Sequence, residues 1–206
     1  AAQEVARRQG AAAGPLDELV VCRRRPVFAP GTTLGVQELY RSHLRVHSLA
    51  RRFPGRTRVP ARDFARLMVR WPGFNCVGEP TAVLLRRRAL KRLGPFDPDL
   101  AMRCDWELAA RVAVGAGLRY VPRTLATFLV HDGAESARCR RGLRFRAEVV
   151  DELLVREALL RAPAYAPVRR EARALGPAAD LTRSLAGAVH AAAARARGDE
   201  RSSADL

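Results

Sequence analysis

The stretch CDWELAARVAVGAG, residues 104–117, decides how the fold is interpreted. From Leu108 onward its apolar residues recur at helical spacing, which predicts an amphipathic helix with a buried face. Its first turn, however, holds Asp105, Trp106 and Glu107. Acidic side chains are favoured there because they meet the positive end of the helix dipole. The dipole accounts for the two acids but not for the tryptophan between them.

Strands and helices alternate on both sides of this helix. This alternation, up to about residue 140, predicts an α/β fold. The strands are too few for a complete doubly wound sheet, so we expect only the second half of one. The pattern predicts strands at 17–22, 81–85, 118–122 and 124–130, helices at 35–53, 61–70 and 86–93, and a loop at 23–33.

The last part of the chain has a different character. From about residue 142 the pattern is helical almost to the end, with breaks at Pro163, Pro167 and Gly176. We therefore divide the sequence into a first part, residues 1–141, and a helical extension, residues 142–206.

The charge of the chain is strongly basic. The 37 Lys and Arg residues exceed the 21 Asp and Glu residues, which gives a formal net charge of +16 and favours phosphate-bearing partners. The arginines are spread along the whole chain, and aromatic residues make up only 6%. Nucleic-acid binders concentrate their charge and interleave it with aromatics. We therefore interpret the charge mainly as solvated helix faces and do not expect a nucleic-acid partner.

Cysteine and hydropathy patterns bear on the compartment. The four cysteines have no CxxC spacing, which argues against a zinc knuckle or a disulfide framework. No apolar run approaches the roughly 18 residues needed to span a bilayer. We expect a cytoplasmic protein, with peripheral contact at the inner face of the membrane as a further option.

Four short segments follow one another in a fixed order. They are Gly78-Glu79-Pro80-Thr81, then LLRRRALKRLGPFD at 84–97, then Asp105-Trp106-Glu107, and finally a strand ending at His131. In this combination they resemble the C-terminal, acceptor-side part of the GT-A fold family-2 glycosyltransferases, which make inverting transfers from nucleotide-sugars. The resemblance runs from Asn75 to about Ser136. It implies a partial, Rossmann-like GT-A sheet.

The resemblance assigns roles to five side chains. Asp105 stands at the position of the catalytic base, which takes the proton of an acceptor hydroxyl. Glu79, Trp106 and Glu107 stand at acceptor- or substrate-binding positions, although a turn glutamate, a core tryptophan and a capping acid are the plainer interpretations. His131 matches a late histidine that in some relatives helps to hold a divalent metal, Mn²⁺ or Mg²⁺.

The sequence departs from the family pattern at several points. Cys104 replaces the usual acid before the aspartate, and Leu129 stands where an arginine is common. We expect the donor-binding half with its D-x-D metal motif to be missing, which would leave the isolated chain inactive. Asp97-Pro98-Asp99 suits a turn better than a metal site. His43 and His47, at i and i+4, are expected to be solvated because no third ligand is apparent.

Two functions from different classes follow. The first is an inverting, nucleotide-sugar-dependent glycosyltransferase that acts on a glycan or lipid-linked acceptor and is present here as a fragment. The second is a non-catalytic basic module that docks on nucleic acid or an anionic membrane. The two differ in their response to salt, because binding driven by phosphate contacts weakens steeply as ionic strength rises.

Overall fold

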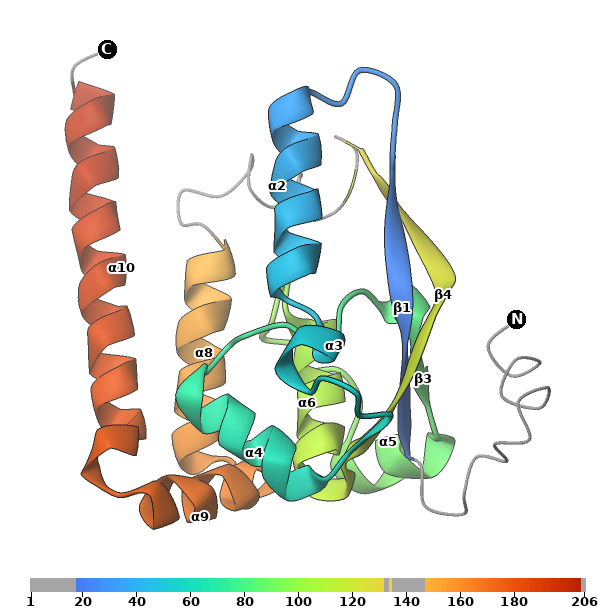
Figure 1. Cartoon of the computed structure of the whole chain (residues 1–206). Helices are drawn as coiled ribbons and strands as arrows, with labels where there is room; N and C mark the ends of the chain where they lie inside the picture. Colours follow the sequence, from blue (N-terminus) through green and yellow to red (C-terminus); the bar gives the residue numbers. More distant parts are fainter. Residues whose placement is uncertain (1–17, 132–133, 135–146, 205–206) are drawn as a thin grey trace.

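The computed structural model describes residues 18–131, 134 and 147–204, and within them four strands form one open mixed sheet (Figure 1). The strands lie in the order β2-β4-β1-β3. β1 and β4 are parallel, whereas β3 and β2 run antiparallel to their neighbours. The expected α/β class is confirmed. The strands are β1 (Leu19–Phe28), β2 (Arg58–Val59), β3 (Val83–Leu85) and β4 (Leu118–Val130).

The central pair of strands is longer than the sequence predicts. The expected loop from residue 23 is wrong, because β1 continues to Phe28. The two strands expected at 118–122 and 124–130 are a single strand, β4. Each of these segments gains its strand conformation from pairing with the other, and such pairing is not visible in local sequence preferences.

The pairing of β1 with β4 contains an irregularity. Cys22 lies opposite Val121, but the next residue, Arg23, lies opposite Thr124. Pro122 falls in the skipped part of β4, where its missing N–H removes no ladder hydrogen bond. The strand therefore continues through Pro122, at which the sequence pattern predicts that a strand ends.

The helix expected at 35–53 is two helices. Thr33 caps the first and Ser48 the second, each side-chain oxygen accepting a backbone N–H from the following turn. Helix 61–70 is found as expected, and the next helix begins one residue later than expected. The helices of this part are α2 (Leu34–Val46), α3 (Leu49–Arg52), α4 (Ala61–Arg70), α5 (Arg87–Leu93) and α6 (Cys104–Ala116).

Helix α6 forms the middle of the core, as the stretch quoted first predicts. Leu108, Val112 and Val114 are at most 1% exposed. The helix ends at Gly117, whose φ of 76° is the left-handed conformation that favours glycine. A Cβ atom at this position would lie 2.6 Å from the Val59 carbonyl oxygen. Glycine thus lets α6 end directly against β2.

The C-terminal part is helical, as expected, and lies to one side of the sheet with α10 outermost (Figure 1). Its first two helices end at Arg161 and Leu175, just before the breaks expected at Pro163 and Gly176. Pro167 does not break a helix, because it lies in the first turn of α9, where a proline costs no hydrogen bond. Within the described ranges no helix has both the length and the apolar character needed to cross a membrane. The elements are α8 (Ala147–Arg161), η2 (Pro163–Tyr165), α9 (Ala166–Leu175), η3 (Pro177–Ala179) and α10 (Leu181–Ala204).

The helical extension contributes to the same hydrophobic core as the sheet. Val155, Tyr165 and Val168, all at most 1% exposed, belong to one cluster with residues of β1 and α6. Asp151 of α8 is 1% exposed as well, and its carboxylate accepts the backbone N–H groups of Ala101, Met102 and Arg103 at 3.1, 2.6 and 2.8 Å. The extension therefore fixes the segment that leads into α6.

Candidate functional site

Asp105 lies in the first turn of α6 and is half-buried. Its Oδ1 accepts the Trp106 backbone N–H at 2.6 Å, which holds the carboxylate at the helix N-terminus. Burial is the largest influence on Asp105 and raises its pKa, while the bond from Trp106 opposes the shift and the negative charge of Glu79 reinforces it. The net result is a carboxylate that is more basic than an ordinary aspartate.

Glu79 lies in the loop before β3 and forms an ion pair with Arg24 of β1. The Arg24 side chain is only 6% exposed, whereas that of Glu79 is 32% exposed. A buried guanidinium needs a carboxylate partner to offset the loss of its hydration. Glu79 therefore stabilises the buried charge of Arg24, whether or not it also contacts a ligand.

The local backbone makes room for this ion pair. The Asn75 Oδ1 accepts the N–H groups of Val77 and Gly78 at 3.1 and 2.8 Å, which forms a tight turn before Glu79. Gly78 has a φ of 96°, and a Cβ atom there would overlap the Arg24 guanidinium. The glycine thus allows the arginine to pass over the backbone and reach the glutamate.

The fold brings Glu79 and Asp105 together, although they are distant in the sequence. The charge of Glu79 acts on Asp105, and both Arg24 and Glu79 act on His43 of α2. Burial and the Arg24 charge lower the pKa of His43, while Glu79 opposes the shift. We refer to Arg24, His43, Glu79 and Asp105 as the acid–base group. It combines an acid from the loop before β3, an acid from the first turn of α6, one imidazole with a lowered pKa and one paired cation.

Trp106 does not belong to this group. Its side chain is 1% exposed and lies within the hydrophobic core. The Arg103 guanidinium lies 6.0 Å from the centre of its ring. Of the two roles weighed for this residue, core packing is the one that such burial supports, since no open ring face remains for a sugar.

Glu107 does not belong to the acid–base group either, because its carboxylate is engaged by Tyr165 and Arg111. It is 4% exposed, and its Oε1 accepts the Tyr165 hydroxyl at 2.8 Å while its Oε2 pairs with Arg111 Nη2 at 2.9 Å. Burial and the neighbouring Glu107 carboxylate raise the pKa of Tyr165 well above its ordinary value, so the phenol remains a donor. Glu107 therefore joins α6 to the helical extension.

His131 follows the end of β4 and is partly exposed. In the part of the chain that the structure describes, no three His, Cys, Asp or Glu side chains are grouped so that they could hold a metal ion. His131 thus lacks companion ligands there, and the described residues do not by themselves fit the metal that the resemblance implies. Ser136 lies outside the described residues.

Two other sequence patterns, Asp97-Pro98-Asp99 and the pair His43 and His47, were weighed as metal sites, and both form contacts within the protein. Asp97 accepts the Asp99 backbone N–H at 3.0 Å, as expected for a turn. His43 is exposed, as expected, whereas His47 is half-buried; the two rings are stacked 4.1 Å apart, and His47 in turn stacks 4.2 Å from Phe74. Burial, His43 and nearby arginines lower the pKa of His47 to about 4, which leaves it neutral at pH 7.

Sequence reasoning missed Arg24, the cation of the acid–base group. The run Arg23-Arg24-Arg25 looked like the start of a loop. In β1 the side chains alternate instead, so Arg24 is largely buried while Arg23 and Arg25 are exposed. Alternation continued from the core residues Leu19 and Val21 would have placed Arg23 inside instead, so a period of two along β1 does not by itself find Arg24.

A pocket of about 490 Å³ lies between β1 and the α2–α3 segment, beside the acid–base group. Arg24 lines this pocket and also forms the ion pair with Glu79.

Comparison with protein-family models, with curated proteins and with solved structures found no match for this chain.

Proposed function

We propose that this chain carries the acceptor side of an inverting, nucleotide-sugar-dependent glycosyltransferase with a partial GT-A fold. The observation that supports the proposal most directly is that the charge of Glu79 acts on Asp105 in the fold, although one lies before β3 and the other is in the first turn of α6. These are two of the acids that the resemblance places at the acceptor. The parallel pairing of β1 with β4 in an open mixed sheet is compatible with a Rossmann-like arrangement.

Asp105 acts as the general base in the proposed reaction. The acceptor hydroxyl oxygen bonds to C1 of the sugar, its proton passes to the Asp105 carboxylate, and the C1–oxygen bond to the nucleotide diphosphate breaks with its electron pair leaving on the diphosphate. A raised pKa suits this role because a more basic carboxylate takes the proton more readily. The attack comes from the face opposite the leaving group, so the configuration at C1 inverts.

The other residues prepare this step without transferring protons. Arg24 neutralises much of the Glu79 charge and so limits the repulsion between the two acids. Glu79, with its side chain 32% exposed, can still accept a hydrogen bond from an acceptor hydroxyl. No step is assigned to a metal, because the described residues do not supply a set of ligands for one.

The test compares Asp105→Asn with the matched variant Asp99→Asn in the full native protein. Asp99 is an exposed acid in the turn before α6, so its replacement removes the same charge without touching the acid–base group. Release of nucleoside diphosphate from a panel of nucleotide-sugars is measured with acceptor present. We expect Asp105→Asn to lower transfer by about 10²- to 10⁴-fold while donor binding is nearly unchanged.

Two results would contradict this assignment. Normal turnover by Asp105→Asn would remove Asp105 from catalysis, and an equal loss in Asp99→Asn would show a general charge effect. The anomeric configuration of the product, determined by NMR, gives an independent check. Retention at C1 would exclude a single displacement.

The second candidate is the non-catalytic basic module, in its membrane-docking form. It is supported by α2, in which no residue is buried and Leu34 and Leu39 are 79% and 66% exposed. Arg41 and Arg45 lie on the same helix and are also exposed. Cosedimentation with anionic vesicles at two salt concentrations separates this function from catalysis, because transfer from a nucleotide-sugar does not require vesicles.

A further inference from the structure

The pocket beside the acid–base group has a cationic rim and a largely apolar floor. Arg23, Arg45 and Arg51 are exposed at its edge, and Arg24 forms part of its wall. The floor includes the buried Val21, Val77, Leu49, Cys22, Cys76 and Tyr120. No Asp or Glu side chain is among the described residues that line it.

Two of the four arginines have an acidic partner and two have none within the described part of the chain. Arg24 pairs with Glu79, and Arg45 pairs with Glu38 on the outer surface. Arg23 and Arg51 form no ion pair with a described carboxylate. The pocket therefore carries an excess of positive charge that an anion would neutralise.

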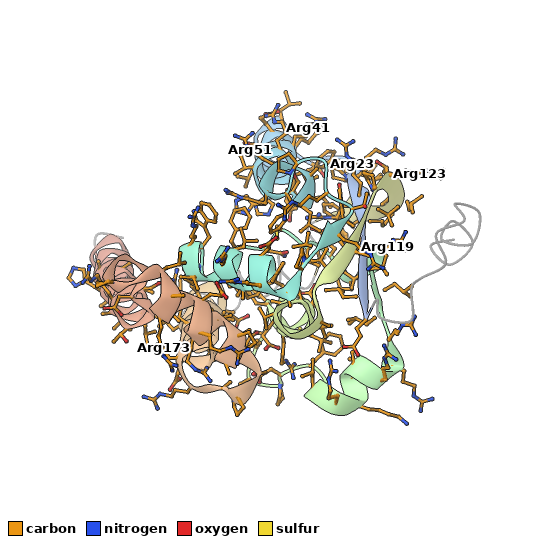
Figure 2. The ribbon with its side chains drawn as sticks, turned by 60° about the horizontal axis from the view of Figure 1, so that its bottom comes forward. Arg23, Arg41, Arg51, Arg119, Arg123 and Arg173 are labelled. Atoms are coloured by element: carbon orange, nitrogen blue, oxygen red, sulfur yellow. The ribbon has the colours of Figure 1, made fainter. Side chains whose placement is uncertain are left out.

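The arginines of the pocket lie on one side of the molecule, although other arginines occur elsewhere on its surface (Figure 2). Figure 2 shows Arg23, Arg41 and Arg51 at the same end of the molecule, whereas Arg173 of α9 lies far from them among the C-terminal helices. Arg23 comes from β1 and Arg51 from α3, so the two charges approach the pocket from different elements. Arginine suits a phosphoryl group because its planar guanidinium donates two parallel hydrogen bonds.

The shape of the pocket limits what the anion can be attached to. A volume of about 490 Å³ is within the range of small-molecule sites and too small for a folded partner. The apolar floor favours a compact, uncharged body, while the rim favours a negative group. A phosphate ester with a short body meets both conditions.

We propose that this pocket binds a phosphate-bearing acceptor, with Arg23 and Arg51 holding the phosphoryl group. This substrate class rests on the proposed function, since the acceptor hydroxyl is the group presented to Asp105. Arg24 connects the two places, because it lines the pocket and pairs with Glu79 of the acid–base group. A phosphate ester held at the rim thus lies beside the acids that act on its hydroxyl.

The test measures binding to the chain itself, without transfer. Glycerol 3-phosphate is titrated calorimetrically, with glycerol as the probe that lacks phosphate, and phosphatidylcholine vesicles with and without phosphatidic acid are tested by cosedimentation. We expect Arg23→Gln and Arg51→Gln each to weaken binding by about tenfold or more. Arg173→Gln, which removes the same charge elsewhere, is expected to change it less than about twofold.

The outcomes separate the source of the phosphate. Saturable binding of glycerol 3-phosphate that depends on Arg23 and Arg51 indicates a free phosphate ester, and binding of the phosphatidic acid vesicles alone with the same dependence indicates a lipid headgroup. Binding of neither probe, or an equal loss in Arg173→Gln, overturns the proposal. Because Arg23 and Arg51 are exposed, their variants are expected to fold, which circular dichroism verifies.

The result is independent of the catalytic assignment. If Asp105→Asn transfers sugar normally and the pocket still binds phosphate, only the proposed reaction fails. If transfer depends on Asp105 but Arg23→Gln and Arg51→Gln bind both phosphate probes as tightly as the wild type, only the acceptor class is wrong.

Discussion

Removing the Tyr165 hydroxyl tests how the helical extension is joined to α6. In Tyr165→Phe the ring remains in the core, and Glu107 loses the donor that lies 2.8 Å from its Oε1. Glu107 is 4% exposed and keeps its contact with Arg111 Nη2 at 2.9 Å. A hydrogen bond to a charged group contributes about 1.5 to 3 kcal/mol to stability. We expect a loss in the free energy of unfolding of about that size.

The same loss can be expressed as a melting temperature. For a chain of 150 to 250 residues, each 1 kcal/mol lowers Tm by about 2 to 4 °C, so Tyr165→Phe should melt about 3 to 12 °C below the wild type. Urea unfolding followed by circular dichroism gives the free energy, and Tyr40→Phe is the control, since Tyr40 contacts Phe128 through its ring at a centroid distance of 5.9 Å. Equal unfolding midpoints for Tyr165→Phe and the wild type would refute the structural role of Glu107.

Two further predictions concern stability at single sites. Asp105→Asn should unfold at higher urea than the wild type at pH 7, by a few tenths to about 1 kcal/mol, because burial raises the pKa of Asp105 and its ionisation is therefore a cost to the folded state. The unfolded chain ionises first as pH rises above about 4, so this difference should vanish at pH 3, and a constant difference at both pH values would contradict it. Gly117→Ala should destabilise by at least about 2 kcal/mol because of its positive φ and the close Val59 carbonyl. Gly115→Ala, with no atom within 4 Å of the added Cβ, should be neutral or stabilising by up to about 1 kcal/mol in the same urea titration.

The sequence predicted those elements in which consecutive residues all favour the same secondary structure. Helix α6 combines helical apolar spacing with a C-terminal Gly117, and both signals are present in the sequence itself. The second half of β1 has no such agreement, because Arg23-Arg24-Arg25 and Pro26 are unfavourable for a strand. Pairing with β4 determines its conformation, and a partner so distant in the chain cannot be inferred from local preference.

In the candidate site, too, the sequence suggests single residues, whereas contacts between distant segments determine how their side chains are placed. The resemblance proposed roles for Asp105 and Glu79 one at a time, and in the fold the charge of Glu79 acts on Asp105. The direction of a side chain depends on contacts across the chain. Glu107 faces Tyr165 of the extension, and Trp106 lies in a core to which that extension contributes. Neither contact has a signal near α6 in the sequence.

The three acids of this region are distinguished by their partners rather than by their type. Glu107 is held by a phenol and a guanidinium in the interior, so both of its carboxylate oxygens are occupied by contacts that stabilise the fold. Glu79 is paired with Arg24, so much of its charge is already neutralised. Asp105 accepts a backbone N–H and is half-buried with a raised pKa. A proton transferred from a hydroxyl would go to the carboxylate that is both basic and free of a cationic partner, and among these three acids that carboxylate is Asp105.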